Sequence, residues 1–267
     1  MISTKKFQNT ILSHYKNHKR DLPWRKTKDP YKILVSEIML QQTQAFRVVP
    51  KYESFLEKFP TVEALAKAKL VDVLNEWQGL GYNRRALYLK KCAEVVVKDY
   101  NGKFPKDFEK LVSLPGIGPA TAGDLMVFAW NIPVVVIETN IRSVFIHFFF
   151  KDKERVHDRE ILPLIEKALD TENPREWYWA LFDYGAFLKK TTNPSRRSFH
   201  HVTQTRFVGS YRQKRAEVLR VLLEEGCIMK KIQNILGYEG AVISEILSDL
   251  EKEGFVRRQA RGVYKIM

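Results

Sequence analysis

The sequence predicts a mainly α-helical protein with a small separate domain at its C-terminus. Three observations support this prediction. Apolar residues recur at helical spacing along most of the chain, Gly and Pro stand at the joints between these segments, and a basic stretch precedes a compact C-terminal pattern. The 267 residues are enough for two or three units with cores of their own.

The predicted helices follow one another in order. One face of an opening helix is formed by Phe7, Ile11, Leu12 and Tyr15. Further helices are expected near residues 31–44, 46–58, 83–100, 107–113, 120–130, 140–149, 158–168 and 175–188. The joints are DPY at 29–31, FPT at 59–61, GLGY at 79–82 and LPGIGP at 114–119.

Residues 189–210 predict a basic connector that leads to a new domain. Between residues 189 and 220 there are nine Lys and Arg residues, and Glu217 is the only acid. The alternative is a solvated linker, but like charges this close together repel one another unless an anion lies nearby.

The segment 211–267 predicts three helices and a basic hairpin. The helices are expected at 212–225, 228–236 and 241–253, and the hairpin turns at 260–262. This order resembles a winged helix-turn-helix domain, in which Arg257 and Arg258 of the hairpin would contact DNA. The alternative is a small helical packing domain that ends in a hairpin.

The charge balance favours a polyanionic partner. The chain carries 45 Lys and Arg against 31 Asp and Glu, a net charge of +14, although such a balance could merely keep the protein soluble. Cys92 and Cys227 are too few and too far apart for a disulfide framework or a cysteine-ligated metal. Because the N-terminus lacks the apolar core of a signal peptide and no segment is long enough to span a bilayer, we expect an intracellular protein.

The segment LPGIGPATAG, residues 114–123, is the sharpest local motif. Gly116 and Gly118 allow a tight turn, and Pro119 suits the first position of a helix. The backbone N–H groups of such a turn can bind a phosphate oxygen without contacting a base. The alternative is a tight connection between two helices.

Several motifs in order carry a resemblance to a known family. They are LPW at 22–24, DPYKILVSEIMLQQTQ at 29–44, FPTVEALA at 59–66, GLGY at 79–82, KFP at 103–105, LPGIGPATAG and the ETN segment at 138–140. Together they resemble the helix-hairpin-helix DNA glycosylases, most of all the adenine glycosylases that act on mispaired adenine. The resemblance covers roughly residues 3–188.

This resemblance implies a two-lobed helical fold that binds double-stranded DNA. One lobe would comprise residues 1–20 and 134–188 and carry Glu138, and the other would comprise 21–133 and carry Glu37 and the hairpin. The DNA would be bent and one nucleotide flipped into the cleft between lobes, because a glycosidic bond cannot be reached inside a stacked duplex.

Glu37 is the expected general acid. It stands among Leu34, Val35, Ile38 and Met39, so burial should raise its pKa and let it hold a proton near neutral pH. It would then protonate the departing base. The alternative is a position at the exposed edge of an amphipathic helix.

Glu138 matches the aspartate with which the family stabilises the positively charged sugar. The electrostatic effect survives this change, but the extra methylene can move the oxygens by about an ångström. The alternative is that Glu138 only caps the helix at 140–149. Asn140 matches a neighbouring asparagine of the family and could bind either carboxylate. Bifunctional relatives attack the sugar with a lysine at the position of Ala120, so this chain is expected to lack lyase activity.

The resemblance also assigns contacts to DNA and to the base. Gln42, Leu80 and Tyr82 would enter the base stack or probe the opposite base. The alternative for Gln42 is a solvated helix face, and the alternative for Leu80 and Tyr82 is packing within a loop. The complete set of expected DNA contacts is Gln42, Thr43, Leu80, Tyr82, Gly116, Gly118, Ala120, Thr121, Arg196, Arg197, Arg257 and Arg258. The base pocket would contain Trp24, Arg25 and Trp179.

The sequence departs from the family at three places. Trp179 replaces a glutamate that binds adenine, and could stack on a base or simply pack in the core. The four cysteines of the family's iron–sulfur cluster are absent from LKKTTNPSRRSFHH, so no cluster is expected, and the only cofactor left open is a monovalent cation at the hairpin. Residues 211–267 do not match the domain with which adenine glycosylases inspect oxidised guanine.

We therefore expect a monomeric, monofunctional DNA glycosylase of base excision repair, with mispaired adenine as the leading substrate. A second hypothesis is a glycosylase of the same fold that removes U, T or C opposite G, or hypoxanthine. A third is a non-catalytic protein that binds damaged DNA.

Overall fold

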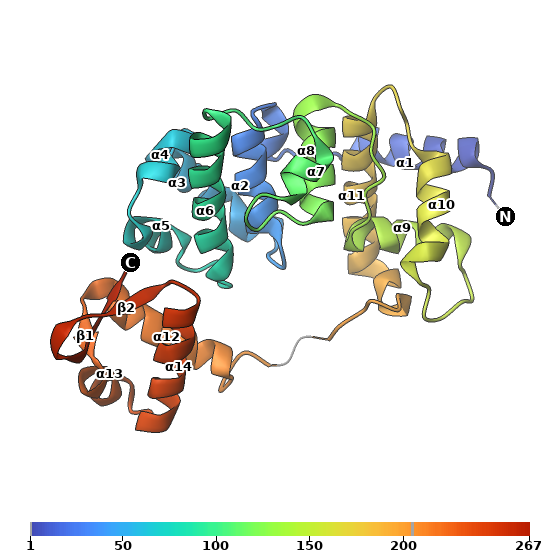
Figure 1. Cartoon of the computed structure of the whole chain (residues 1–267). Coiled ribbons are helices and arrows are strands. Elements are labelled where there is room, and N and C mark those ends of the chain that lie inside the picture. Colours follow the sequence, from blue (N-terminus) through green and yellow to red (C-terminus); the bar gives the residue numbers. More distant parts are fainter. Residues whose placement is uncertain (1, 204–205) are drawn as a thin grey trace. The chain divides into compact units, whose positions relative to one another are not determined.

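The computed structural model describes residues 2–203 and 206–267, so the part of the predicted connector at 204–205 lies outside the described residues. The fold is mainly helical, as expected (Figure 1). It forms two compact units, Met1–Ile38 with Phe104–Thr203 and Met39–Lys103 with Gln204–Met267. This division differs from the predicted lobes, because the hairpin residues 104–133 group with residues 134–203. Among the described residues no helix is both long and apolar enough to cross a membrane.

The first unit is a helical bundle with an aromatic centre. Its elements are α1 (Thr4–His18), the 3-10 helix η1 (Pro23–Lys26), most of α2 (Pro30–Leu40), α7 (Phe108–Val112), α8 (Pro119–Trp130), α9 (Thr139–Phe149), α10 (Asp158–Ala168), α11 (Pro174–Thr191) and η2 (Pro194–Arg197). Phe7 of α1 makes edge-on contacts with Phe145, Phe149 and Trp177. These rings join α1, α9 and α11 by burying large apolar surfaces.

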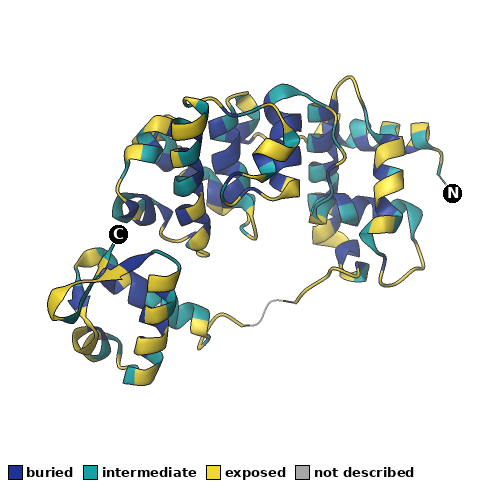
Figure 2. Ribbon diagram, in the orientation of Figure 1, coloured by how far each residue is buried: buried dark blue, intermediate teal, exposed yellow. Residues whose placement is uncertain are grey.

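Helix α8 lies in the interior of this unit. Every residue from Thr121 to Ala129 is buried (Figure 2). The sequence explains this position, because α8 is apolar nearly all round instead of along one stripe. Its one acidic residue, Asp124, is therefore buried with the rest.

The second unit contains four helices of the central sequence and the C-terminal domain. The four helices are α3 (Ala45–Lys58), α4 (Val62–Lys67), α5 (Leu70–Trp77) and α6 (Arg84–Tyr100). The sequence analysis did not predict α4 and α5 as helices. The signal for α5 was present, since Leu70, Val73, Leu74 and Trp77 follow helical spacing and are all buried.

The C-terminal domain has the predicted winged-helix order of elements. It consists of α12 (Tyr211–Glu224), β1 (Cys227–Ile228), α13 (Met229–Leu236), α14 (Gly240–Lys252), β2 (Val256–Arg258), the turn η3 (Ala260–Gly262) and β3 (Val263–Ile266). The strands form one antiparallel sheet in the order β1-β3-β2. Cys227 pairs with Tyr264, and Val256 pairs with Ile266. Strand β1 was not predicted, because two residues are too few for an alternating pattern.

The apolar run before Glu138 is an extended segment and not a strand of a sheet. The hydroxyl of Tyr178 on α11 holds it from both sides, accepting from the N–H of Val136 and donating to the carbonyl of Val134. Gly123 of α8 leaves room for Val136, since a Cβ there would lie 2.8 Å from Val136 Cγ2. The segment that leads to Glu138 is thus fixed against α8 and α11.

Gly185 brings α11 close to the start of α9. A Cβ at residue 185 would lie 2.5 Å from the carbonyl oxygen of Asn140 and 2.7 Å from its Cα. Because these are backbone atoms, a side chain cannot be accommodated by a change of rotamer. The absence of a side chain at Gly185 therefore sets the position of residues 138–140.

We predict that Gly185→Ala destabilises the protein by roughly 1–3 kcal/mol, because the added methyl group must displace the backbone of Asn140. Urea unfolding followed by circular dichroism measures the change. Gly240→Ala is the matched control, since its Cβ would meet nothing closer than 3.6 Å. Equal stabilities of the two variants would contradict this account of the α9–α11 contact.

Candidate active site

Glu37 lies near the end of α2 with apolar neighbours on both sides. Leu34, Val35, Ile38 and Met39 are all buried, whereas Glu37 keeps part of its surface exposed. Burial and then the negative charge of Glu138 raise the pKa of Glu37 to about 8, although the charge of Arg25 opposes the rise. The Glu37 carboxyl group therefore holds a proton at neutral pH, in a residue that is not completely buried.

Glu138 is the N-cap of α9, so the helix-capping role considered from the sequence is present. Its Oε1 accepts from the N–H of Ile141 at 2.9 Å, and its Oε2 accepts from Asn140 Nδ2 at 3.1 Å. Burial raises the pKa of Glu138 although these hydrogen bonds and Arg142 lower it. Capping does not separate Glu138 from the site, because its charge still acts on Glu37. The cap instead fixes where the carboxylate lies.

Asp124 is a third carboxyl group of this site, and the sequence analysis missed it. It is 7% exposed, and its Oδ1 has no hydrogen-bond partner among residues 2–203 and 206–267. Burial raises its pKa well above the ordinary value, and Glu37 and Glu138 add to the rise. The available signal was a lone acid in the otherwise apolar α8. Three carboxyl groups from α2, α8 and the cap of α9 thus share one electrostatic site.

Arg25 is tied to a buried carboxylate that the sequence analysis also missed. Its guanidinium donates to both oxygens of Asp183, at 2.9 and 2.7 Å, and Arg20 adds bonds from its backbone and side chain. Burial opposes ionisation of Asp183, but the bonds from Arg25 and Arg20 hold its pKa below the usual value. Asp183 thereby fixes the cation that faces Glu37.

Two of the predicted pocket residues are in contact. The Arg25 guanidinium lies 5.6 Å from the centre of the Trp179 ring, and Trp179 stacks on Phe128 with ring centres 5.9 Å apart. Trp179 is half-buried, so its ring packs on Phe128 without being enclosed. Trp24 is buried at 6% exposure. Of the predicted pocket, Arg25 and Trp179 therefore adjoin each other.

The hairpin between α7 and α8 presents the predicted turn at the surface. Gly116, Gly118 and Ala120 are exposed, while Leu114 and Ile117 anchor the turn in the core. Gly116 has a φ of 78°, which a side chain would disfavour. Gly118 is the N-cap of α8 and Pro119 its first residue. Thr121 is buried in the first turn of α8, unlike the other three predicted hairpin contacts.

Two loops of the second unit are held by one guanidinium that the sequence analysis missed. Arg85 donates to the carbonyls of Met39 and Gln41 and to Thr43 Oγ1, and also to the carbonyls of Leu80 and Gly81. Burial lowers the pKa of Arg85 to about 10, so it stays charged at neutral pH. One side chain therefore joins the loop that follows α2 to the GLGY loop.

Each of these loops has one non-glycine residue in the left-handed region. Gln42 has a φ of 56° and Tyr82 a φ of 49°. Such conformations are costly and are concentrated at functional sites. Gln42 is exposed, Tyr82 is 40% exposed and Leu80 is buried, and their contacts with DNA stay predictions.

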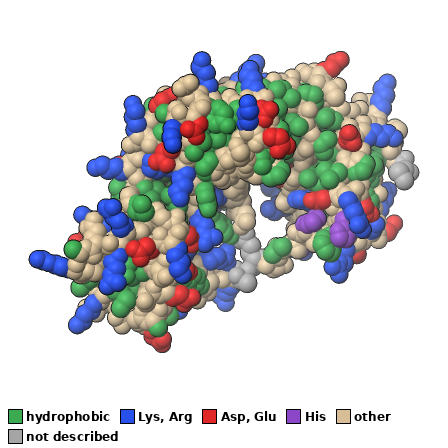
Figure 3. Space-filling view, viewed as in Figure 1, with side chains coloured by type: hydrophobic (Ala, Val, Ile, Leu, Met, Phe, Trp, Pro, Cys, Tyr) green, Lys and Arg blue, Asp and Glu red, His purple; other side chains and the backbone are tan. Residues whose placement is uncertain are grey.

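The four predicted arginine contacts differ in their surroundings. Arg197 donates to the carbonyls of Phe150, Lys151 and Lys153 and so closes the end of α9. Arg196, Arg257 and Arg258 are exposed. Figure 3 shows Lys and Arg side chains spread over both units on the face in view.

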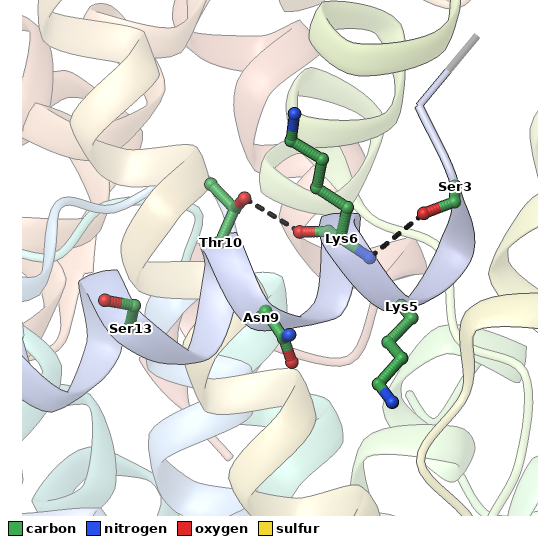
Figure 4. A pocket seen from close by; sticks show the side chains of 6 residues that line it. All are labelled: Ser3, Lys5, Lys6, Asn9, Thr10 and Ser13. Carbon is green, nitrogen blue, oxygen red and sulfur yellow. Dashed lines mark hydrogen bonds between the residues drawn. The ribbon is translucent and has the colours of Figure 1, made fainter.

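A hollow on α1 has no part in this site. It is lined by Ser3, the N-cap of α1, and by Lys5, Lys6, Asn9, Thr10 and Ser13 of that helix (Figure 4). It contains no carboxyl group, and its hydrogen bonds serve the helix itself, from Lys6 N–H to Ser3 and from Thr10 to the Lys6 carbonyl.

No His, Cys, Asp or Glu cluster in the described part of the chain has the arrangement of a metal site. The two cysteines are buried in separate parts of the second unit, Cys92 in α6 and Cys227 in β1 of the C-terminal domain. Two thiols cannot supply the four ligands of an iron–sulfur cluster, so the residues present do not fit that group.

We predict that Asp124→Asn makes stability less dependent on pH. The pKa values of Asp124 and Glu37 are higher in the folded than in the unfolded protein. Their contribution to the free energy of unfolding is therefore complete below the unfolded-state pKa values and is lost as pH rises through the folded-state pKa values. Removing one buried charge should reduce the loss between pH 5 and pH 8 by about 1 kcal/mol or more. Urea unfolding at both pH values measures it, with exposed Asp99→Asn as control. Parallel losses in Asp124→Asn and wild type would contradict the shared site.

Comparison with known proteins identifies the family. Residues 35–167 match the model of the HhH-GPD superfamily base excision DNA repair proteins. The chain is 35% identical over 198 residues to an adenine DNA glycosylase of Buchnera aphidicola subsp. Baizongia pistaciae. The matched region covers 72% of this chain and 56% of that relative. It therefore spans about half the length of this relative. It is 30% identical over 193 residues to a thymine/uracil-DNA glycosylase of Methanothermobacter thermautotrophicus, covering 71% of this chain and 87% of that protein.

The fold comparison agrees with the sequence comparison. The structure of a thermostable thymine-DNA glycosylase matches with a TM-score of 0.66 at 30% identity, over 72% of this chain and 90% of that one. The motifs, the helical hairpin and these matches lead to one conclusion: the chain belongs to the HhH-GPD superfamily of base excision DNA repair proteins.

Proposed function

We propose that this protein is a monofunctional DNA glycosylase that removes a mispaired base from double-stranded DNA. The observation that carries the proposal is the cluster of Glu37, Asp124 and Glu138, in which Glu37 holds a proton at neutral pH and stays partly exposed. A purely structural carboxyl group gains nothing from such a site, whereas a general acid requires it.

The proposed chemistry uses a protonated Glu37 and an ionised Glu138. Glu37 donates its proton to a ring nitrogen of the flipped base while the bond between that base and C1′ breaks, so the bond's electron pair leaves with a neutral base. The sugar is left as an oxocarbenium-like cation. Water then adds to C1′ and gives a proton back to the Glu37 carboxylate, which leaves an abasic site.

Glu138 stabilises the cationic sugar through its charge. Its two hydrogen bonds, from Ile141 N–H and Asn140 Nδ2, hold the carboxylate without reorganisation during the reaction. Gly185 and Tyr178 fix the backbone around Glu138. The position of its carboxylate, on a side chain one methylene longer than the family's aspartate, is therefore set by this backbone and by the two hydrogen bonds. Burial, followed by the negative charges of Glu37 and Glu138, raises the pKa of Asp124, so Asp124 stays neutral in this cluster.

The final nucleophile is water and not the protein. Ala120 stands where bifunctional relatives carry a lysine, and a methyl side chain cannot form a Schiff base with the sugar. We therefore propose that the strand remains intact after base removal. The exposed hairpin at Gly116 and Gly118 would hold a DNA phosphate through backbone N–H groups, with or without a monovalent cation, and no chemical step depends on that cation.

Adenine in a mismatch is the first proposed substrate, and thymine or uracil opposite G is the second. The first rests on the 35% identical adenine glycosylase. The second rests on the thymine/uracil glycosylase, since the chain covers 87% of that protein. Trp179 also favours a pocket that stacks on its base, because an indole offers one donor and no acceptor.

We predict that Glu37→Gln lowers the rate of base release by roughly 100-fold or more, since an amide cannot donate the acidic proton. A panel of duplexes with A opposite 8-oxoguanine or G, and U, T or C opposite G, followed by alkali, measures abasic product. DNA affinity should be retained, and Glu53→Gln, an exposed carboxylate of α3, is the control. A wild-type protein that binds these duplexes and releases no base would instead be a damage-binding protein.

We predict that wild-type protein cleaves no strand without alkali and forms no covalent adduct with DNA on borohydride treatment, because Ala120 provides no amine. A denaturing gel resolves both products. A trapped adduct would overturn the monofunctional assignment.

We predict that single-turnover excision decreases as pH rises through about 8, where Glu37 loses its proton. In Asp124→Asn the decrease should occur at the same pH, because Asp124 is still protonated when Glu37 titrates and adds no charge to it. Rapid-quench rates from pH 6 to 10 measure both profiles. A decrease that moves to lower pH in Asp124→Asn would contradict this order of protonation.

A further inference from the structure

The Tyr82 ring projects from a loop whose backbone is fixed. Arg85 binds the carbonyls of Leu80 and Gly81, and Arg47 binds the carbonyl of Gly79. Gly79, Gly81 and Tyr82 all have positive φ, and only the last has a side chain that must tolerate it. The loop therefore presents one exposed aromatic ring at a defined place.

Two guanidinium groups face this ring. Arg85 Cζ lies 5.5 Å from the ring centre and Arg212 Cζ lies 6.0 Å from it, both at cation–π distance. Arg212 Nη1 also donates to the Tyr82 hydroxyl at 2.9 Å. Arg85 belongs to α6, whereas Arg212 is in the first turn of α12, the first helix of the C-terminal domain. The C-terminal domain thus contacts the ring directly.

A partly buried cluster of ion pairs holds the C-terminal domain against the start of α6. Glu253, which follows α14, accepts two bonds from Arg215 of α12 and two from Arg84 at the start of α6. Although burial opposes ionisation, these bonds lower the pKa of Glu253 to about 2. The cluster stays charged at physiological pH, and α12 also packs against α5.

The third helix of the C-terminal domain is poorly suited to a DNA groove. Winged-helix domains that bind DNA place this helix in the major groove. Here α14 exposes Glu245 and Glu251, and its Asp249 accepts from the Tyr211 hydroxyl. Acidic side chains repel phosphates, so the helix does not supply a DNA-binding face. The first helix of the domain, α12, instead contacts Tyr82 through Arg212.

We propose that the C-terminal domain sets the preference for the base opposite the excised one, by fixing the ring of Tyr82 through Arg212. The inference rests on the proposed glycosylase function, in which Tyr82 probes the duplex. Arg212 is a positioning residue: it does not touch the reacting atoms, and it restricts where the ring can lie when the duplex is bound.

The test is the excision rate on matched duplexes that differ only in the base opposite the target. In Arg212→Ala the ratio of rates between the best and the next-best opposite base should fall by about tenfold, which corresponds to about 1.4 kcal/mol. Tyr82→Phe removes only the hydroxyl that Arg212 binds, and should reduce the ratio in the same direction. The double variant should fall no further than the larger single effect, because both changes remove one interaction.

Arg220→Ala is the matched control. Arg220 is exposed on the same helix, so its loss removes the same charge and lowers general DNA affinity equally without touching Tyr82. Glu253→Gln should lower the ratio as well, since it weakens the cluster that holds α12.

The outcomes separate the two proposals. Wild-type protein that releases no base from any duplex would contradict the proposed function. Wild-type protein that excises, with an unchanged ratio in Arg212→Ala and Tyr82→Phe, would overturn the inference alone. Additive losses in the double variant would also overturn it, because the two side chains would then act independently.

Discussion

The burial of Glu37, Asp124 and Glu138 within one electrostatic cluster is the constraint on which the site depends. Three carboxyl groups in a place with little water cannot all be ionised at neutral pH, and the cost falls on the groups with fewest hydrogen bonds. Glu138 has two donors, whereas Asp124 has an unpartnered oxygen among the described residues. The cluster therefore separates into a carboxylate at Glu138 and protonated groups at Glu37 and Asp124. That is the division of roles which acid-assisted base departure requires.

The rest of the first unit keeps these groups in place. Gly185 admits the backbone of Asn140, and Gly123 admits the side chain of Val136, so α8, α9 and α11 meet at distances that larger residues would prevent. The Tyr178 hydroxyl holds the extended segment between them. Asp183 holds the opposing cation, Arg25. Apolar burial supplies stability throughout, but these few contacts decide where charge lies.

The sequence predicted what local patterns encode. Helical spacing predicted most helices, the glycines of LPGIGP predicted the hairpin, and the apolar neighbours of Glu37 predicted its raised pKa. Asp183 and Arg85 could not be found in this way, because their partners are distant in sequence and only packing brings them together. Asp124 was detectable as the lone acid of an apolar helix, but the motif beside it explained the segment without it. Contacts group the hairpin with α9 and α11, and local patterns do not encode such a grouping.

The central claim is that Glu37 holds a proton at neutral pH in the free protein. Carbon-detected NMR of protein with ¹³C-labelled glutamate side-chain carboxyl groups tests it directly, with Glu37→Gln assigning the resonance. We expect one glutamate signal that titrates near pH 8 in wild type and disappears in the variant. Titration of every glutamate below pH 5 would contradict it.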